Sequence, residues 1–149
     1  MTEKRSNNIV IASVFLWLGF VGAISFLESW IKFQAPGVTL SIGLGIGQLV
    51  FGALNKVEWF FALVILAALF FGKKSNRFAN TTFYFSAFII LIIQTVWLLP
   101  ALDARALLYI THQPVPSSGL HIYFVVAEVL KVACLIITGI IFLKKYQYD

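Results

Sequence analysis

Three ionisable side chains lie inside apolar stretches of this sequence, where a charge is unfavourable unless it is compensated. Glu58 directly precedes the apolar run WFFALVILAALFF, and Glu128 and Lys131 lie within IYFVVAEVLKVACLII. An ionised residue at the centre of a membrane helix costs about 2.5–3.5 kcal/mol, so such groups are paired, neutralised or hydrated. Two carboxylates and an amine in this setting are suited to binding a polar ligand or carrying protons.

Polar residues in the same stretches extend this set. Asn55 lies three residues before Glu58, Gln94 interrupts another apolar run, and His121 precedes Glu128 by seven residues on the same helical face. The candidate ligand-binding or proton-handling residues are therefore Asn55, Glu58, Gln94, His121, Glu128 and Lys131. A hydrogen-bonding or proton-handling role for His121 competes with haem ligation and with an ordinary position at the membrane interface.

Four long apolar segments must position these residues. The chain has 149 residues, of which 60% are hydrophobic and only 11% charged. A soluble domain needs more polar surface than this, whereas about 20 apolar residues suffice for a helix to cross a membrane. We therefore predict an all-α membrane protein, a single domain over residues 1–149 built as a four-transmembrane-helix bundle. The expected helices cover about residues 9–27, 39–71, 81–101 and 120–143.

The second of these helices is longer than a membrane requires. It lies within Val38 to Phe71, whose 34 residues would extend roughly 50 Å as a helix, against a hydrocarbon core of about 30 Å. It either protrudes or tilts, or it breaks within SIGLGIGQ, where Gly43, Gly45 and Gly47 permit both a break and close helix packing. We expect a protruding or tilted helix in which the glycines mediate packing.

The basic residues predict that both termini are cytoplasmic. The connections opposite the chain ends offer only Lys32 and Arg105, each near an acidic residue. All other basic residues outside the helices fall on the side of the termini: Lys4, Arg5, Lys73, Lys74, Arg77, Lys144 and Lys145. Because cytoplasmic loops are enriched in lysine and arginine, the expected protein is an integral protein of the plasma (inner) membrane with both ends inside.

The candidate residues lie at similar depths in the expected bundle. Lys131 lies 12 residues before Leu143, and Glu58 lies 13 residues before Phe71. At 1.5 Å per residue both are about 18–20 Å from the inner ends of their helices, near the bilayer centre. We therefore predict that Asn55 and Glu58 meet Glu128 and Lys131 across the bundle, and that the inner half of the bundle is purely apolar.

Two interpretations of these charges remain open. Buried ion pairs can fix the register of helices without any functional role. Alternatively, the residues line a polar cavity in the outer half of the bundle that binds a ligand or carries protons. The pairs Glu28/Lys32 and Asp103/Arg105 are expected to be outer polar staples, and Lys56 is expected to extend outward toward the interface.

Several segments, in order along the chain, resemble one membrane protein family. They are FLWLGFVGAISF, IGLGIGQLVFGALN, VWLLPALDARA and SSGLHIYFVVAEVLKVACLI. Together they are similar to the four-helix family of unknown function that includes proteins similar to transmembrane protein 205. The resemblance covers nearly the whole chain and implies a four-helix membrane bundle, without implying an activity.

A weaker resemblance concerns Asn55-x-x-Glu58, preceded at a distance by KFQAPG. This pattern looks like the second helix of the glutathione-dependent trimeric membrane enzymes of eicosanoid metabolism. That resemblance implies a four-helix glutathione-dependent enzyme, but the third and fourth expected helices lack the matching arginines.

The sequence thus predicts a small integral membrane protein with an ionisable pocket that binds or transports a small ligand or protons. The alternatives are a non-catalytic subunit or scaffold of a membrane complex and a glutathione-dependent enzyme. No catalytic residue, metal ligand or cofactor is indicated, and a single cysteine, Cys134, excludes a multi-cysteine metal site. The expected partners are the lipid bilayer, a small-molecule ligand and a second copy or another membrane subunit, but no nucleic acid.

Overall fold

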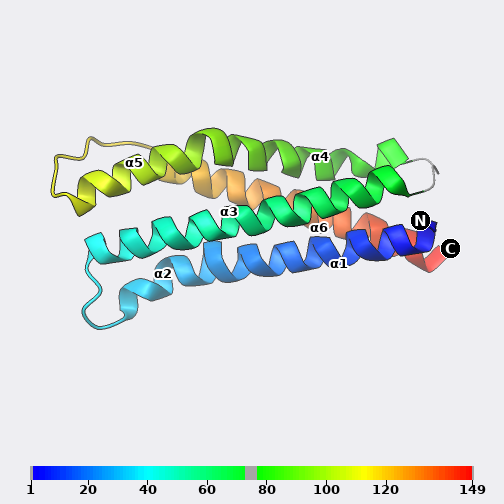
Figure 1. Cartoon of the computed structure of the whole chain (residues 1–149), viewed down its shortest axis with the longest axis horizontal. Coiled ribbons are helices and arrows are strands. Elements are labelled where there is room, and N and C mark those ends of the chain that lie inside the picture. The colour runs from blue at the N-terminus through cyan, green and yellow to red at the C-terminus, as the bar shows by residue number, and fades with distance from the viewer. Residues whose placement is uncertain (1, 73–76, 149) are drawn as a thin grey trace.

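The computed structural model describes residues 2–72 and 77–148, which form four long antiparallel helical spans in an elongated bundle (Figure 1). The first span comprises α1 (Glu3–Val21), the π-helical segment η1 (Gly22–Glu28), α2 (Ser29–Ile31) and the 3₁₀ turn η2 (Lys32–Gln34). The second is α3 (Leu40–Phe71). The third comprises α4 (Arg77–Ile93), the π-helical segment η3 (Gln94–Leu98) and α5 (Leu99–Ile110), and the fourth is α6 (Leu120–Tyr148).

The four spans give the bundle two different ends. Both chain termini lie together at one end, which we call the terminal end (Figure 1). The connections 35–39 and 111–119 lie at the opposite, distal end. Lys73 and Lys74, which contribute to the expected cytoplasmic charge, lie outside the described residues.

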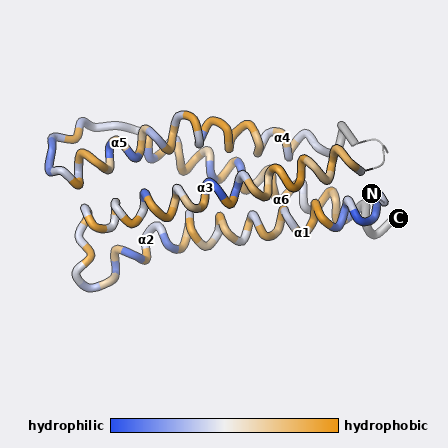
Figure 2. The backbone as a smooth tube through the Cα atoms, viewed as in Figure 1, coloured by the Kyte–Doolittle hydropathy of each residue, from blue (hydrophilic) through white to orange (hydrophobic). Residues whose placement is uncertain are grey.

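Each span is long and apolar enough to cross a membrane. Figure 2 shows hydrophobic residues along most of every span, with hydrophilic positions at both ends and near the middle. The spans are long enough to cross a membrane, because the shortest of the four candidate segments has 25 residues and about 20 suffice for a crossing. The expected all-α fold, with four helices long and apolar enough to span a membrane, is thereby confirmed.

The helices extend beyond the expected boundaries. The first span begins at Glu3 rather than near residue 9 and remains helical to Gln34. The third continues past residue 101 to Ile110, and the fourth reaches Tyr148. The expected boundaries followed the apolar runs, but a helix can continue through polar residues beyond such a run, because its backbone groups bond to one another along the helix.

The second span is one unbroken helix through its glycines. Thr39 caps its first turn by accepting a hydrogen bond from the Ile42 amide at 3.3 Å. A Cβ atom at Gly43 would overlap the ring of Phe33, and a Cβ at Gly47 would lie 3.1 Å from the Lys32 Nζ. The glycines therefore let the end of the first span lie close against α3, as expected from their spacing.

Packing between spans differs at the two ends of the bundle. α1 packs against α3 and α6, α4 packs against α6, and α5 packs against α3. The third span therefore shifts from α6 toward α3 as it runs to the distal end. In the terminal half the spans close around a core of wholly buried apolar residues that includes Val14, Ala62, Ile65, Leu91 and Leu135.

The terminal half contains buried polar groups but no buried charge among the described residues. The Ser6 hydroxyl donates to the Ala68 carbonyl at 2.6 Å, and the Tyr84 hydroxyl donates to the Ala62 carbonyl at the same distance. The prediction of a purely apolar inner half was therefore wrong in this respect. Hydroxyl groups are tolerated there because backbone carbonyls of α3 accept their hydrogen bonds.

Candidate functional site

Four of the candidate residues meet in a buried hydrogen-bonded cluster near the middle of the bundle. Lys131 Nζ donates to a carboxylate oxygen of Glu58 and lies 2.9 Å from Glu128 Oε2. The Gln94 amide joins the same groups, accepting from Lys131 Nζ at 2.7 Å and donating to Glu128 Oε2 at 2.6 Å. None of the four residues is more than 4% exposed. Glu58 and Glu128 thus meet at Lys131, as the sequence predicts.

Two residues of the first span complete the cluster. The Trp17 indole Nε1 donates to Glu58 Oε1 at 2.9 Å, and the Ser25 hydroxyl lies 2.7 Å from Glu128 Oε1. Every span therefore contributes at least one side chain. Sequence reasoning missed Trp17 and Ser25, because an uncharged residue in an apolar helix is no different from its neighbours until the helix orientation is known.

Both π-helical segments lie at this cluster. Ser25 is in η1, and Gln94 is the first residue of η3. A π-helical segment widens the helix locally and is often found at functional sites. In η3 the widening precedes Pro100, whose missing amide and bulky ring cannot complete a regular helical turn. Two consecutive residues then reach different neighbours: Gln94 reaches α6, while Thr95 faces α3.

Asn55 does not join this cluster, contrary to the prediction. Its amide donates to the Thr95 hydroxyl at 2.9 Å, and the Trp59 indole donates to the same oxygen at 3.0 Å. Thr95 in turn donates to the Leu91 carbonyl at 2.8 Å. Asn55 lies three residues before Glu58, so the directions of the two side chains differ by about 60° around the helix, enough for them to face different spans. Asn55 fastens α3 to the third span.

A cavity of about 480 Å³ lies between the spans on the distal side of the cluster. Its floor includes Ser25 and Glu128, so one carboxylate belongs both to the cavity wall and to the buried cluster. Its apolar walls include the rings of Phe26, Phe33, Phe51 and Phe124. Its other polar and charged lining residues are Ser29, Lys32, Gln48, Asp103, Arg105, Tyr109, Ser118 and His121. The shift of α5 from α6 toward α3 accounts for this opening.

The cations of the cavity wall are engaged by neighbours. Lys32 Nζ lies 3.2 Å from Glu28 Oε2, one turn away, so this expected staple is present. The same ammonium lies over the rings of Phe33 and Phe51, with centroid distances of 5.7 and 5.6 Å.

The second expected staple is not formed. Arg105 Nη1 donates to the Pro116 carbonyl at 2.7 Å, and no ion pair joins it to Asp103 within the described chain. The two residues are only two positions apart, about 200° around the helix, and so cannot face each other. Gln48 instead donates to the Asp103 carbonyl at 2.9 Å and holds α3 against α5.

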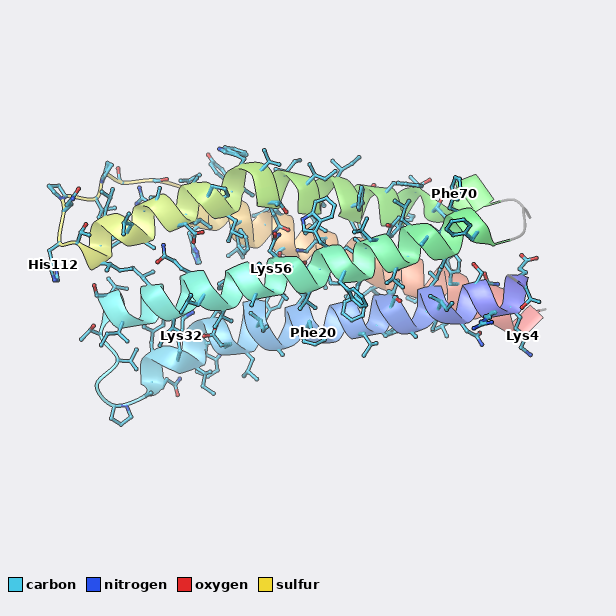
Figure 3. The ribbon with its side chains drawn as sticks, viewed as in Figure 1. Lys4, Phe20, Lys32, Lys56, Phe70 and His112 are labelled. Atoms are coloured by element: carbon cyan, nitrogen blue, oxygen red, sulfur yellow. The ribbon has the colours of Figure 1, made fainter. Side chains whose placement is uncertain are left out.

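His121 and Lys56 lie apart from the cluster. His121 is exposed in the cavity wall two turns above Glu128 and makes no hydrogen bond to the cluster. Lys56 is exposed near the middle of α3 (Figure 3). Among the described residues, no hydrogen bond or ion pair involves Lys56.

Within residues 2–72 and 77–148, no group of three or more histidine, cysteine or acidic side chains is arranged to hold a metal ion. Comparison with protein families, curated proteins and solved structures finds no match to this chain. The two family resemblances therefore stay predictions, and the interpretation of the site depends on its own geometry.

Proposed function

We propose that this membrane protein binds a small ligand in the distal cavity, with Glu128 at the floor of the binding site. The observation that carries the proposal is that Glu128 borders both the cavity and the buried cluster. One of its oxygens contacts Ser25 at the cavity wall, and the other accepts from Gln94 and Lys131 inside the bundle. A structural ion pair would not need to border a cavity, whereas a polar group at the base of an apolar pocket is typical of ligand sites.

The cavity opens on one side of the cluster. On the terminal side, wholly buried side chains such as Val14, Ile65 and Leu135 pack the bundle without a break in the core. This arrangement supports a one-sided binding site, or a transporter captured in one of its states, over a continuous channel. The basic residues favour a cytoplasmic terminal end, so the cavity would face the other side of the plasma membrane.

The cavity lining suggests an amphipathic ligand. Four phenyl rings offer apolar contact, while Gln48, Ser29 and Ser118 offer hydrogen bonds. A volume of about 480 Å³ is within the range of small-molecule sites, about 300–1,000 Å³. We propose a ligand with an apolar body and one polar or charged group, the latter directed toward the floor.

A second candidate function is a scaffold within a larger membrane assembly. It is favoured by the completeness of the cluster, because no buried side-chain nitrogen or oxygen among the described residues lacks a hydrogen-bond partner. Such closed networks can specify how helices pack without any ligand. A test of ligand binding must therefore give a result that a stable cluster without a ligand site would not give.

The test is a thermal-shift screen of amphipathic ammonium and carboxylate compounds on the purified protein. A ligand present at 100 times its dissociation constant should stabilise the protein by about 2.7 kcal/mol. Ser29→Phe, which fills part of the cavity, should abolish this shift, whereas Lys56→Met on the outer surface should keep it. Equal shifts in both variants would place the ligand on the outer surface and contradict the proposal.

A further inference from the structure

The buried cluster contains one more acidic group than basic group. Its ionisable members are two carboxylates, Glu58 and Glu128, and one ammonium, Lys131. If all three were ionised, the cluster would carry one net negative charge. An uncompensated charge in such a setting costs several kcal/mol, because protein and lipid solvate it far less well than water does.

No other basic side chain of the described residues balances this charge. Lys32 is paired with Glu28, and the Arg105 guanidinium is bonded to the Pro116 carbonyl. Lys56 faces outward from α3, and His121 is exposed two turns above Glu128. The remaining acidic group of the cavity, Asp103, lies on α5 and forms no ion pair with the cluster. The compensating positive charge must therefore come from outside the side chains of this site.

The short distances between the polar atoms of the cluster limit the size of the cation that it can bind. The hydrogen bonds among Gln94, Glu128, Lys131 and Ser25 measure 2.6–2.9 Å. Of these residues, Gln94, Glu128 and Lys131 are almost fully buried. An organic cation or a hydrated ion does not fit between groups at these distances. We propose that the cluster of Glu58, Gln94, Glu128 and Lys131 binds one exchangeable proton, which enters from the distal cavity through Ser25 and Glu128.

The hydrogen bonds of Glu128 indicate which of its oxygens can hold this proton. Oε2 of Glu128 already accepts hydrogen bonds from Gln94 and Lys131, whereas Oε1 contacts only the Ser25 hydroxyl. A serine hydroxyl both donates and accepts, and it rotates to suit its partner. The proton therefore resides on Glu128 Oε1, and the resulting O–H group donates a hydrogen bond to Ser25 Oγ.

Proton uptake needs no other reactant. A hydronium ion in the cavity gives a proton to Ser25 Oγ and leaves as water, while Ser25 passes its own hydroxyl proton to Glu128 Oε1. The cluster then changes from a net charge of −1 to 0, and no other bond is made or broken. The inference rests on the proposed function only in that the proton enters through the cavity. The bound proton itself can be detected without any ligand.

Infrared difference spectroscopy of the reconstituted protein at neutral pH tests the proposal through the C=O band of protonated carboxyl groups. We expect one such band in the wild type. Glu58→Gln and Glu128→Gln should each abolish the whole band, because each leaves one carboxylate and one ammonium, a neutral pair. Asp103→Asn, which changes an acid of the cavity outside the cluster, should keep it. If each single variant lost half of the band, Glu58 and Glu128 would each hold a proton, and the proposal of one proton for the cluster would be overturned.

Two further measurements test the cation and the route. The band should be the same in sodium and in choline buffers, whereas a band that appears only without sodium would assign the site to a metal cation and overturn the proposal. In deuterium oxide the band should shift more slowly in Ser25→Ala than in Ser29→Ala, a nearby serine of the same cavity. An unaltered rate in Ser25→Ala would overturn the route. A wild type without any protonated-carboxyl band would overturn the proposal as a whole.

Discussion

Replacing Lys131 by methionine is expected to lower the free energy of unfolding by about 3–5 kcal/mol, because it leaves the buried carboxyl groups of Glu58 and Glu128 without their cation. Lys131 is fully buried and contacts Glu58, Glu128 and Gln94. Methionine keeps most of the volume, so the loss reports on charge and hydrogen bonding. The measurement is the equilibrium unfolding of the protein in mixed micelles titrated with denaturing detergent, followed by circular dichroism.

Two variants control this result. Lys56→Met makes the same chemical change at an exposed position on α3 and is expected to change the stability by about 0.5 kcal/mol or less. The triple variant Glu58→Gln, Glu128→Gln, Lys131→Met removes every charge of the cluster and should recover most of the stability, since an entire buried ionic group can often be replaced without loss. A triple variant as unstable as Lys131→Met would attribute the effect to packing and contradict the electrostatic explanation.

Truncating Trp17 to alanine is expected to cost about 3–5 kcal/mol, comparable to the loss of a large core side chain. Trp17 is wholly buried in α1, and its indole donates to Glu58 Oε1. Trp17→Phe separates the two contributions, because it keeps an aromatic ring but removes the N–H donor. It should cost about 1.5–3 kcal/mol, the range for a hydrogen bond to a charged group.

The matched control for Trp17 is Trp97→Ala in η3, where the side chain is 55% exposed. Its effect on the unfolding free energy should stay near 0.5 kcal/mol. The same unfolding titration serves for both positions. If Trp17→Phe is as stable as the wild type, the indole does not hold Glu58 in place, and Ser25 alone joins the first span to the cluster.

The charged part of the cluster could be predicted from the sequence because charge is rare in apolar helices. Counting residues from the helix ends placed Glu58, Gln94 and Lys131 at a similar depth, and the structure brings them together. The four spans followed from apolar length alone. Their true ends did not, since an apolar count does not show how far a helix continues past the expected boundary, as the third span does to Ile110.

The rotation of each helix was not predictable in the same way. Asn55 and Glu58 were both expected to meet Glu128 and Lys131, but a difference of about 60° in their directions is enough to reach different spans. The π-helical segments changed the rotation again, and they direct Ser25 and Gln94 into the cluster. Trp17 carries no charge and lies in an apolar helix, so only the packed structure shows its bond to Glu58.

The most direct test of a distal cavity that reaches the buried cluster is cysteine accessibility in sealed vesicles, in a Cys134→Ser background. A charged, membrane-impermeant thiol reagent is added to the distal side of proteins with one cysteine at Ser25, Ser29 or Ala87. We predict labelling at Ser29 and, more slowly, at Ser25 on the cavity floor, and none at Ala87, which is wholly buried in the terminal half. Labelling at Ser29 without any at Ser25 would mean that water stops short of Glu128. The cluster would then be a dry structural network, which contradicts a binding site with Glu128 at its floor.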